Sequence, residues 1–539
     1  MNNKHSRTGL VELYDTTLRD GAQTKGVHFS LRDKLAIIEL LDDFGIDIIE
    51  AGWNGANVTD TGLFRELGRR TLSNSRIAAF CSTYHPSRSV DSDPVFSAGT
   101  AVDVPVMTLF GKSWDFQVSE SLRIPLERNV DIIAESLAYC RRRFDTLVFD
   151  AEHFFDGLET NPDYSLAVVE AALDAGADRV VLCDTNGGRL PWQIRQAVDT
   201  VRNRFPDADF GIHGHNDADT AVANSLAAVE GGVFQVQGTI NGIGERCGNT
   251  NLCSLIPNLA LKCGYRMKFV TPERLAQLRA LSCRVAELTR VPVIDNQPYV
   301  GDNAFTHKAG VHIASVLKHP GCYEHIEPKW VGHRRQLVIS EQSGRVAISH
   351  KLEGMGYGAH DETTLRQLVE EIKRLSSQGY SFDRAEVSLE LLIHDMLGGP
   401  GKGPTLEHLT CESLPGIATE DLYRIELALS FGGKMRFRRQ FSEHPVAAIQ
   451  GMLLELMRKE WTGFESPSIL QVNAEVLDNG RQRAWVNLGP GGSSRAMVVT
   501  AASQQTAQCL AVAESYRWAW FSALNGMGRH AHSVMACPA

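Results

Sequence analysis

The sequence has 539 residues, of which 43% are hydrophobic and 22% are charged, and its formal net charge is -10. This is the composition of an ordinary soluble globular protein, and the length predicts more than one domain. A chain with this acidic balance has no basic surface for a phosphate backbone. Nucleic acid is therefore not expected as its partner.

The cysteines and the start of the chain indicate the compartment. Eleven cysteines are scattered without the spacing of a metal site or a disulfide framework, and reduced thiols are the simplest account of them. Residues 1–9 are polar and lack the apolar centre of a signal peptide, and no run approaches the length of a membrane span. We therefore expect a soluble, cytoplasmic protein without a membrane partner.

Strand-like runs alternate with helix-like segments over residues 10–265. The eight apolar runs are Val11–Tyr14, Ile46–Ala51, Ile77–Cys81, Val102–Leu109, Thr146–Phe149, Arg179–Cys183, Phe210–His213 and Phe234–Gln237. Between them, segments such as Ser30–Phe44 and Pro191–Phe205 show helical periodicity. This alternation predicts an α/β fold, a (β/α)8 barrel of the TIM type. A doubly wound open sheet is less favoured, because no glycine-rich dinucleotide motif follows the first run.

The seventh run carries a pair of histidines. Side chains on a strand alternate between its faces, so His213 and His215 point to the same side. Two neutral imidazoles on one side are suited to a divalent metal, which needs only one or two oxygen ligands from elsewhere. Two hydrogen-bonded or solvated histidines are the alternative interpretation.

Polar residues follow several of the predicted strands, at the edge where active sites of this fold lie. Each could be a helix cap or a turn if it stood alone, but together they converge on one rim. The segments are Asp15–Gly21, Glu50, Asp150–His153, Asp184–Gly187, the histidine pair and Asn241–Asn249.

Three of these segments carry a family resemblance: Asp15–Gln23 (DTTLRDGAQ), His213–Asp217 (HGHND) and Gly242–Asn249 (GIGERCGN). They resemble the aldolase-like, metal-dependent barrel enzymes, which include isopropylmalate, homocitrate and citramalate synthases and hydroxymethylglutaryl-CoA lyase. Within this family, Glu50–Trp53 and Asp150–Gly157 are most similar to the citramalate synthases. The resemblance covers residues 10 to about 350 well and the remainder poorly.

The resemblance implies a metal shell and a substrate site. The implied ligands are Asp20, His213, His215 and Asn249, the last directly or through water, and Mg²⁺, Mn²⁺ or Zn²⁺ would suit this oxygen and nitrogen shell. Arg19 would neutralise the alkoxide that develops as a new carbon–carbon bond forms, although a surface ion pair is its alternative role. The other implied residues are Gln23 and Thr185 for substrate binding and Glu152 as the acidic residue of the fifth strand.

Two further residues lie beyond the predicted barrel, in segments similar to the accessory region of the synthases. In these enzymes the counterparts of His307 and Tyr323 approach the active site from the neighbouring subunit. The resemblance therefore implies a homodimer with shared sites, in which the two residues serve proton transfer at the acetyl group or the hydrolytic step. The alternative is that both are linker residues facing solvent.

The rest of the chain is predicted as two parts. Residues 266–385 are a mainly helical linker, and residues 386–530 alternate strand and helical periodicity as a small α+β domain. This domain resembles the dimeric effector-binding domain of several of these synthases, but Val498–Ser503 replaces their usual Gly-Val-Ser segment. A dimerising role is therefore at least as well supported as regulation by an end product.

The implied activity is an acyltransferase that condenses acetyl-CoA with a small 2-oxo acid, pyruvate being the first choice, to give citramalate and CoA. An isopropylmalate- or homocitrate-type synthase acting on another 2-oxo acid and a non-catalytic regulatory relative are the alternatives. The side-chain pocket of the oxo acid is not fixed by the sequence. Its candidates, taken from the strand ends, are Trp53, Asn54, Cys81, Thr108 and Phe110.

Overall fold

The structure is a computed structural model that describes residues 9–398, 403–415, 421–489 and 495–524. The chain divides into two compact units. The first takes the residues up to Ala304 together with Ile326–Arg334, and the second takes Phe305–His325 and the residues from Arg335 onward.

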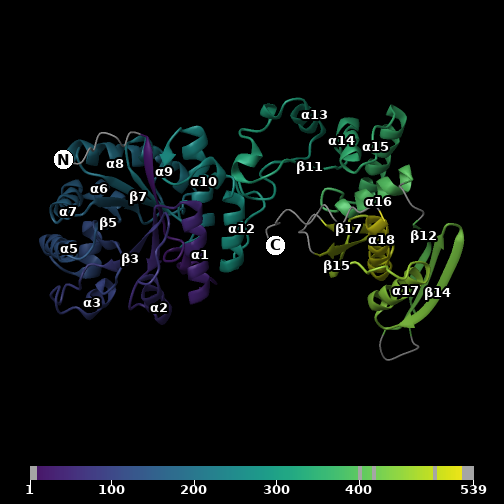
Figure 1. The fold of residues 1–539 in the computed structure, drawn as a ribbon, viewed down its shortest axis with the longest axis horizontal. Coiled ribbons are helices and arrows are strands. Elements are labelled where there is room, and N and C mark those ends of the chain that lie inside the picture. Colours follow the sequence, from purple (N-terminus) through teal and green to yellow (C-terminus); the bar gives the residue numbers. More distant parts are fainter. Residues whose placement is uncertain (1–8, 399–402, 416–420, 490–494, 525–539) are drawn as a thin grey trace. The chain divides into compact units, whose positions relative to one another are not determined.

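The first unit is built on a closed parallel barrel, as the sequence predicts (Figure 1). Its strands follow one another in chain order, and the barrel closes because β1 pairs in parallel with both β2 and β8. The strands are β1 (Leu10–Asp15), β2 (Ile48–Gly52), β3 (Arg76–Ser82), β4 (Val106–Lys112), β5 (Thr146–Glu152), β6 (Arg179–Asp184), β7 (Phe210–Gly214) and β8 (Gln235–Gly238). The fourth strand starts later than its predicted run, since residues 102–105 precede the first paired position at Val106.

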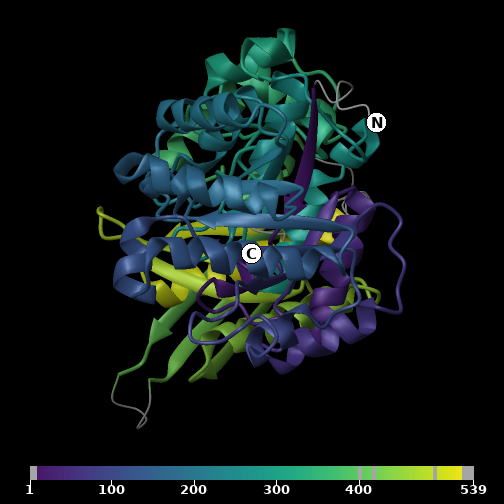
Figure 2. The ribbon, with the colours of Figure 1, turned by 90° about the vertical axis from the view of Figure 1, so that its left-hand side faces the viewer.

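Helices cover the outside of the barrel, and both ribbon views show them around the strands (Figure 2). Local hydrogen bonds cap the first helix: the Ser30 hydroxyl accepts from the Asp33 amide, and the Asp33 carboxylate accepts from the Ser30 amide. The principal helices are α1 (Leu31–Phe44), α2 (Val58–Leu67), α3 (Pro94–Thr100), α5 (Leu126–Arg141), α6 (Phe154–Thr160), α7 (Pro162–Asp174), α8 (Pro191–Arg204) and α9 (Ala221–Glu230).

The barrel interior is filled by side chains rather than open. A layer of buried residues comes from successive strands, and β-branched and small residues predominate in it. Its members are Tyr14, Ile48, Ala78, Val106, Val148, Val181 and Cys183. This packed layer lies inside the barrel, beneath the carboxyl ends of the strands that form the rim.

The first unit continues past the barrel. A short strand, β9 (Arg266–Met267), pairs in parallel with the start of β1. Helix α10 (Leu252–Pro257) precedes this strand, and α11 (Pro272–Leu275) and α12 (Leu278–Thr289) follow it. Helix α12 packs against α1.

The second unit begins with a short parallel ladder between β10 (Thr306–His307) and β11 (Gln336–Leu337). A helical part follows around its own apolar core, which includes Ile348, Leu368 and Ile393. Its helices are α13 (Gly310–Lys318), α14 (Arg345–Gly354), α15 (Glu362–Ser377) and α16 (Glu386–Leu397).

Two antiparallel three-stranded sheets complete the second unit, and α17 (Pro445–Glu460) and α18 (Gln504–Leu524) share a core with them. One sheet contains β12 (Pro404–Ser413), β13 (Tyr423–Phe431) and β14 (Lys434–Ser442); the other contains β15 (Ile469–Val476), β16 (Gln482–Leu488) and β17 (Ala496–Ala501). Residues 525–530, with which the predicted α+β domain ends, lie outside the described residues.

In the part of the chain that the structure describes, no helix is both long enough and apolar enough to cross a bilayer.

One buried ion pair fixes the turn that follows β2. Lys34 of α1 pairs with Asp60 of α2 and also donates to the carbonyl of Ala51, 3.2 Å away. Asp60 in turn accepts from the Trp53 amide at 3.1 Å. The pair therefore orients the residue that begins the rim segment after β2.

We expect Lys34→Met to destabilise the protein by about 3–5 kcal/mol, because it leaves the carboxylate of Asp60 buried without its cation. The measurement is the thermal unfolding of the full chain. Lys25→Met is the matched control, since Lys25 is exposed. Equal transition temperatures for the two variants would contradict the stabilising role of the pair.

Candidate metal centre and active site

A buried carboxylate and two imidazoles meet at the carboxyl ends of the barrel strands. They are Asp20, which follows β1, and His213 and His215, at the end of β7. One ligand atom from each lies within 4.8 Å of the others, and no other such group occurs in the described parts of the chain. The predicted pair of imidazoles and its predicted carboxylate are thus brought together.

The loop after β8 brings a fourth residue to this group. Asn249 forms an isolated antiparallel bridge with His215, and its Nδ2 lies 3.1 Å from Nε2 of His213. Nδ1 of His215 and Oδ1 of Asn249 are both buried with no hydrogen-bond partner. Unpartnered buried acceptors are costly, and a cation bound among them would satisfy both. The donor set therefore fits a divalent metal.

Gly244 makes this approach of the loop possible. A Cβ atom at this position would lie 1.9 Å from Oδ1 of Asn249 and 3.3 Å from Oδ1 of Asp20. No side chain can be accommodated at such a distance. The glycine in the loop motif is therefore a steric requirement of the cluster.

A hydrogen-bond relay behind the cluster sets the orientation of one imidazole. Nδ1 of His213 lies 2.8 Å from Oε1 of Gln237, and Nε2 of Gln237 donates to Oδ1 of Asp150 at 3.0 Å. With Nδ1 as the donor, the lone pair of His213 is on Nε2, which faces Asp20 and Asn249. Sequence reasoning missed Gln237, although a polar residue in the fully buried strand β8 was a usable signal.

Arg19 is fixed by two carboxylates and an aromatic ring. Its Nη1 donates to Asp20 at 3.1 Å, its Nε donates to Glu50, and its guanidinium lies 3.9 Å from the ring centroid of Phe80. Glu50 is also bound by the hydroxyl of Tyr14 at 2.7 Å. The guanidinium is therefore a preorganised positive charge beside the cluster.

An aromatic wall stands next to Arg19. Phe80 and Phe110 stack with ring centroids 5.0 Å apart, and Trp53 packs edge-on against both at 6.1 and 5.9 Å. Of the other predicted pocket residues, Thr108 shares a 2.7 Å hydrogen bond with Tyr14, and Asn54 donates to the carbonyl of Ala98. The wall is therefore formed by Trp53 and Phe110, with Phe80 as the member that the sequence did not indicate.

Electrostatics favour the metal-binding forms of Asp20 and His215, whereas the pKa of His213 is raised, because the effect of burial is outweighed by its contact with the Asp20 carboxylate. Burial opposes ionisation of Asp20, but Arg19 and His213 hold its pKa well below the usual value. Burial, with the neighbouring His213, lowers the pKa of His215 to about 3, so this imidazole is neutral at pH 7. Burial and the charge of Glu50 raise the pKa of Asp150 to about 7. A carboxylate and a neutral imidazole are the forms that bind divalent cations.

The remaining predicted barrel residues lie around the same rim. Thr185 follows β6; its hydroxyl accepts from the His153 amide at 2.9 Å, and its carbonyl accepts from Arg246 at 2.7 Å. Glu152 ends β5 and pairs with Lys112 at 2.5 Å. Gln23 lies in the short turn after Asp20 and is exposed.

His307 and Tyr323 belong to the second unit. His307 is buried in β10, and its Nε2 lies 3.2 Å from Oε1 of Glu324. The ring of Tyr323 stacks on that of His312 with centroids 4.0 Å apart, and 45% of this tyrosine is exposed. The two predicted residues thus lie in one unit, and Tyr323 directly precedes Glu324, the partner of His307.

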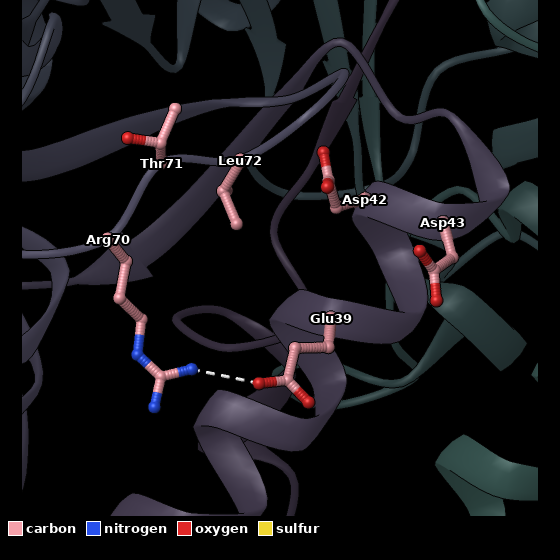
Figure 3. A pocket seen from close by; sticks show the side chains of 6 residues that line it. All are labelled: Glu39, Asp42, Asp43, Arg70, Thr71 and Leu72. Atoms are coloured by element: carbon pink, nitrogen blue, oxygen red, sulfur yellow. Dashed lines mark hydrogen bonds and ion pairs between the residues drawn. The ribbon is translucent and has the colours of Figure 1, made fainter.

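A surface hollow of about 440 Å³ lies elsewhere on the first unit, beside α1 (Figure 3). Its ion pair joins Arg70 and Glu39 at 2.8 Å. The Asp42 carboxylate accepts hydrogen bonds from the amides of Ser73, Asn74 and Ser75. Asp42 therefore serves the backbone of a loop, and the hollow lacks the converging groups that the rim provides.

The protein has a closed parallel barrel with a buried carboxylate–imidazole cluster at the carboxyl ends of the strands. These features define its class as a TIM-barrel enzyme with a candidate metal centre. The sequence matches the HMGL-like family over residues 10–282 and the homocitrate synthase post-HMGL domain-like family over residues 299–380. The chain therefore belongs to the HMGL-like family.

Among its relatives are several (R)-citramalate synthases. The chain is 50% identical to that of Aquifex aeolicus over 72% of this chain and 73% of the relative. It is 45% identical to that of Synechocystis over 89% and 92%, and 40% identical to that of Geobacter sulfurreducens over 88% and 90%.

We expect Gln237→Leu to weaken metal binding about 10- to 100-fold, because His213 loses the acceptor that fixes its tautomer. The measurement is a calorimetric titration of the metal-free full chain with Mn²⁺. Gln196→Leu, on the exposed face of α8, is the matched control. An unchanged dissociation constant in Gln237→Leu would show that the relay does not support the site.

Proposed function

We propose that this protein condenses acetyl-CoA with pyruvate, giving citramalate and CoA. The observation that carries the proposal is the buried group of Asp20, His213 and His215 with Arg19 beside it. The similarity to (R)-citramalate synthases over most of the chain supports the same activity.

In this proposal, Asp20, His213, His215 and Asn249 hold one divalent cation, Mg²⁺, Mn²⁺ or Zn²⁺. The oxygen and nitrogen donors, with no thiolate among them, suit all three. When bound, the cation would act as a Lewis acid that polarises the keto group of the oxo acid. The two unpartnered atoms, Nδ1 of His215 and Oδ1 of Asn249, support the assignment.

Arg19 would stabilise the charge that develops on the keto oxygen. It is held on Glu50 and Asp20, so it needs no reorganisation as the charge forms. Thr185 and Gln23 would bind the carboxylate end of the oxo acid from the neighbouring rim segments.

The aromatic wall supports a small substrate. Trp53, Phe80 and Phe110 pack on one another, and Phe80 also packs on the guanidinium of Arg19. The methyl group of pyruvate needs less room there than a branched or carboxylated side chain. The wall therefore favours pyruvate over the oxo acids of isopropylmalate and homocitrate synthases.

Glu152, His307 and Tyr323 would serve the acetyl half of the reaction. A base removes a proton from the acetyl methyl group, and the resulting carbanion attacks the keto carbon, whose oxygen takes up a proton. Water then cleaves the thioester and releases CoA. His307 is our choice for the base, and Glu152 and Tyr323 are then available for proton transfer in the later steps.

We also propose that the protein works as a homodimer and that its sequence divides by role. Residues 10–265 form the catalytic barrel, residues 266–385 the linker that supplies His307 and Tyr323 to the site of the other subunit, and residues 386–530 a dimerising domain. The mixed sheet-and-helix core of the last part, which buries residues of both sheets, is consistent with an independent domain.

The proposed activity predicts metal-dependent thiol release from acetyl-CoA. We expect release with pyruvate, at least about 10-fold faster than with 2-oxoisovalerate or 2-oxoglutarate, and none after the cation is removed with EDTA. The measurement is a thiol-reagent assay with citramalate detected by mass spectrometry. Absence of metal-dependent release with every oxo acid in the panel would refute the enzymatic proposal.

A complementation test addresses the shared site. His213→Ala and His307→Ala should each retain only a small residual activity as a homodimer, while a mixture refolded or co-expressed together should regain up to about one quarter of wild-type activity, since one intact site forms in half of the dimers. His28→Ala, an exposed residue, is the control for either variant. An inactive mixture of folded variants would place both residues on the same subunit.

A further inference from the structure

Two residues of the second unit, His307 and Arg335, converge on the buried carboxylate of a third, Glu324. The ladder between β10 and β11 sets His307 beside the segment that begins with Arg335, since the Gln336 amide donates to the carbonyl of Phe305 and the Val338 amide donates to that of His307. Glu324, from the loop after α13, extends its side chain to both. Only 3% of the Glu324 side chain is exposed.

The two oxygens of Glu324 are shared between an arginine and the histidine. Nε of Arg335 donates to Oε1 at 2.6 Å, and Nη2 of Arg335 donates to Oε2 at 2.5 Å. Nε2 of His307 lies 3.2 Å from the same Oε1. The guanidinium thus binds the carboxylate in a bidentate manner, the strongest and most directional arrangement of such a pair.

This contact decides the tautomer of His307. A carboxylate can only accept, so the imidazole proton is on Nε2 and the lone pair of the neutral ring is on Nδ1. Burial opposes the charge on Glu324, but the hydrogen bonds from Arg335 and His307 lower its pKa below the usual value. The carboxylate therefore stays ionised and can also stabilise a protonated imidazole.

The residue before Glu324 is constrained as well. Tyr323 stacks on His312 of α13, with ring centroids 4.0 Å apart. The side chain of Tyr323 is exposed while that of Glu324 is buried, so the two neighbours point to different surroundings. Anchoring Glu324 thus also fixes the backbone that presents Tyr323.

We propose that Glu324, held by Arg335, is a positioning residue that keeps His307 in the tautomer with its basic lone pair on Nδ1. This inference rests on the proposed function, in which His307 removes the acetyl proton. Nδ1 takes that proton, the electron pair of the broken C–H bond moves into the thioester enolate, and the imidazolium remains bound to Glu324. The proton leaves Nδ1 again when the ring acts as an acid or meets solvent.

The test compares Glu324→Gln and Glu324→Leu in the full chain. Glutamine retains an oxygen acceptor without the charge, whereas leucine retains neither. We expect kcat to fall about 10-fold in the first and at least about 100-fold in the second, with the KM for pyruvate unchanged, since removing a group that orients a general base acts on the proton transfer. Glu327→Gln, at an exposed position, is the matched control.

Two readouts separate positioning from a purely structural role. With trideuteroacetyl-CoA, the isotope effect on kcat should increase in Glu324→Leu, because proton abstraction becomes slower than the other steps. In the His307→Ala background, adding Glu324→Leu should cause no further loss of kcat, because Glu324 acts through His307. An unchanged Mn²⁺ dissociation constant verifies that the barrel of each variant is folded.

The outcomes are distinct. If the wild-type protein forms no citramalate, the proposed function fails and the role of Glu324 fails with it. If the wild-type protein is active, an isotope effect that does not change in Glu324→Leu, or a further loss of kcat in the double variant, overturns the positioning role and leaves the proposed function intact.

Discussion

Closure of the barrel by β1 is the constraint on which the candidate site depends. β1 pairs with both β2 and β8, so the segment after β1 and the loop after β8 are adjacent although they are far apart in sequence. This adjacency lets Asp20 and Asn249 approach the histidines of β7 from two sides. An open sheet, with β1 and β8 at different edges, could not assemble the same four residues.

Burial of charge is the second requirement, and it explains why the site needs so many supporting residues. Arg19, Asp20 and Glu50 are compatible with a buried rim only because each has an opposite charge or a hydrogen-bond donor beside it. The same hydrogen bonds and ion pairs also fix the orientation of these charged side chains. Gln237 and Asp150 orient His213 from behind, in the way that outer-shell partners orient metal ligands in general.

In each of the two units, hydrogen bonds fix the tautomer of one histidine, but different structural elements supply them. In the barrel, an amide side chain and a carboxylate fix the tautomer of a histidine on a strand. In the second unit, a carboxylate held by an arginine contacts a histidine on a short ladder. In the first case the lone pair is on Nε2 and suits a metal ligand; in the second it is on Nδ1 and suits a base.

Local sequence patterns determined the order and type of the barrel elements. Each apolar run overlaps one of the eight strands, because a parallel strand covered on both faces needs nearly continuous apolar residues. The same patterns placed Asp20, His213, His215 and Asn249 at strand ends, where the fold requires its site.

Tertiary structure alone decided what depends on packing between distant elements. The relay through Gln237, the contribution of Phe80 to the aromatic wall and the hold of Glu324 on His307 depend on side-chain directions across strands and loops. Sequence spacing does not encode such contacts, because they form only when the barrel and the short ladder bring separate segments into register.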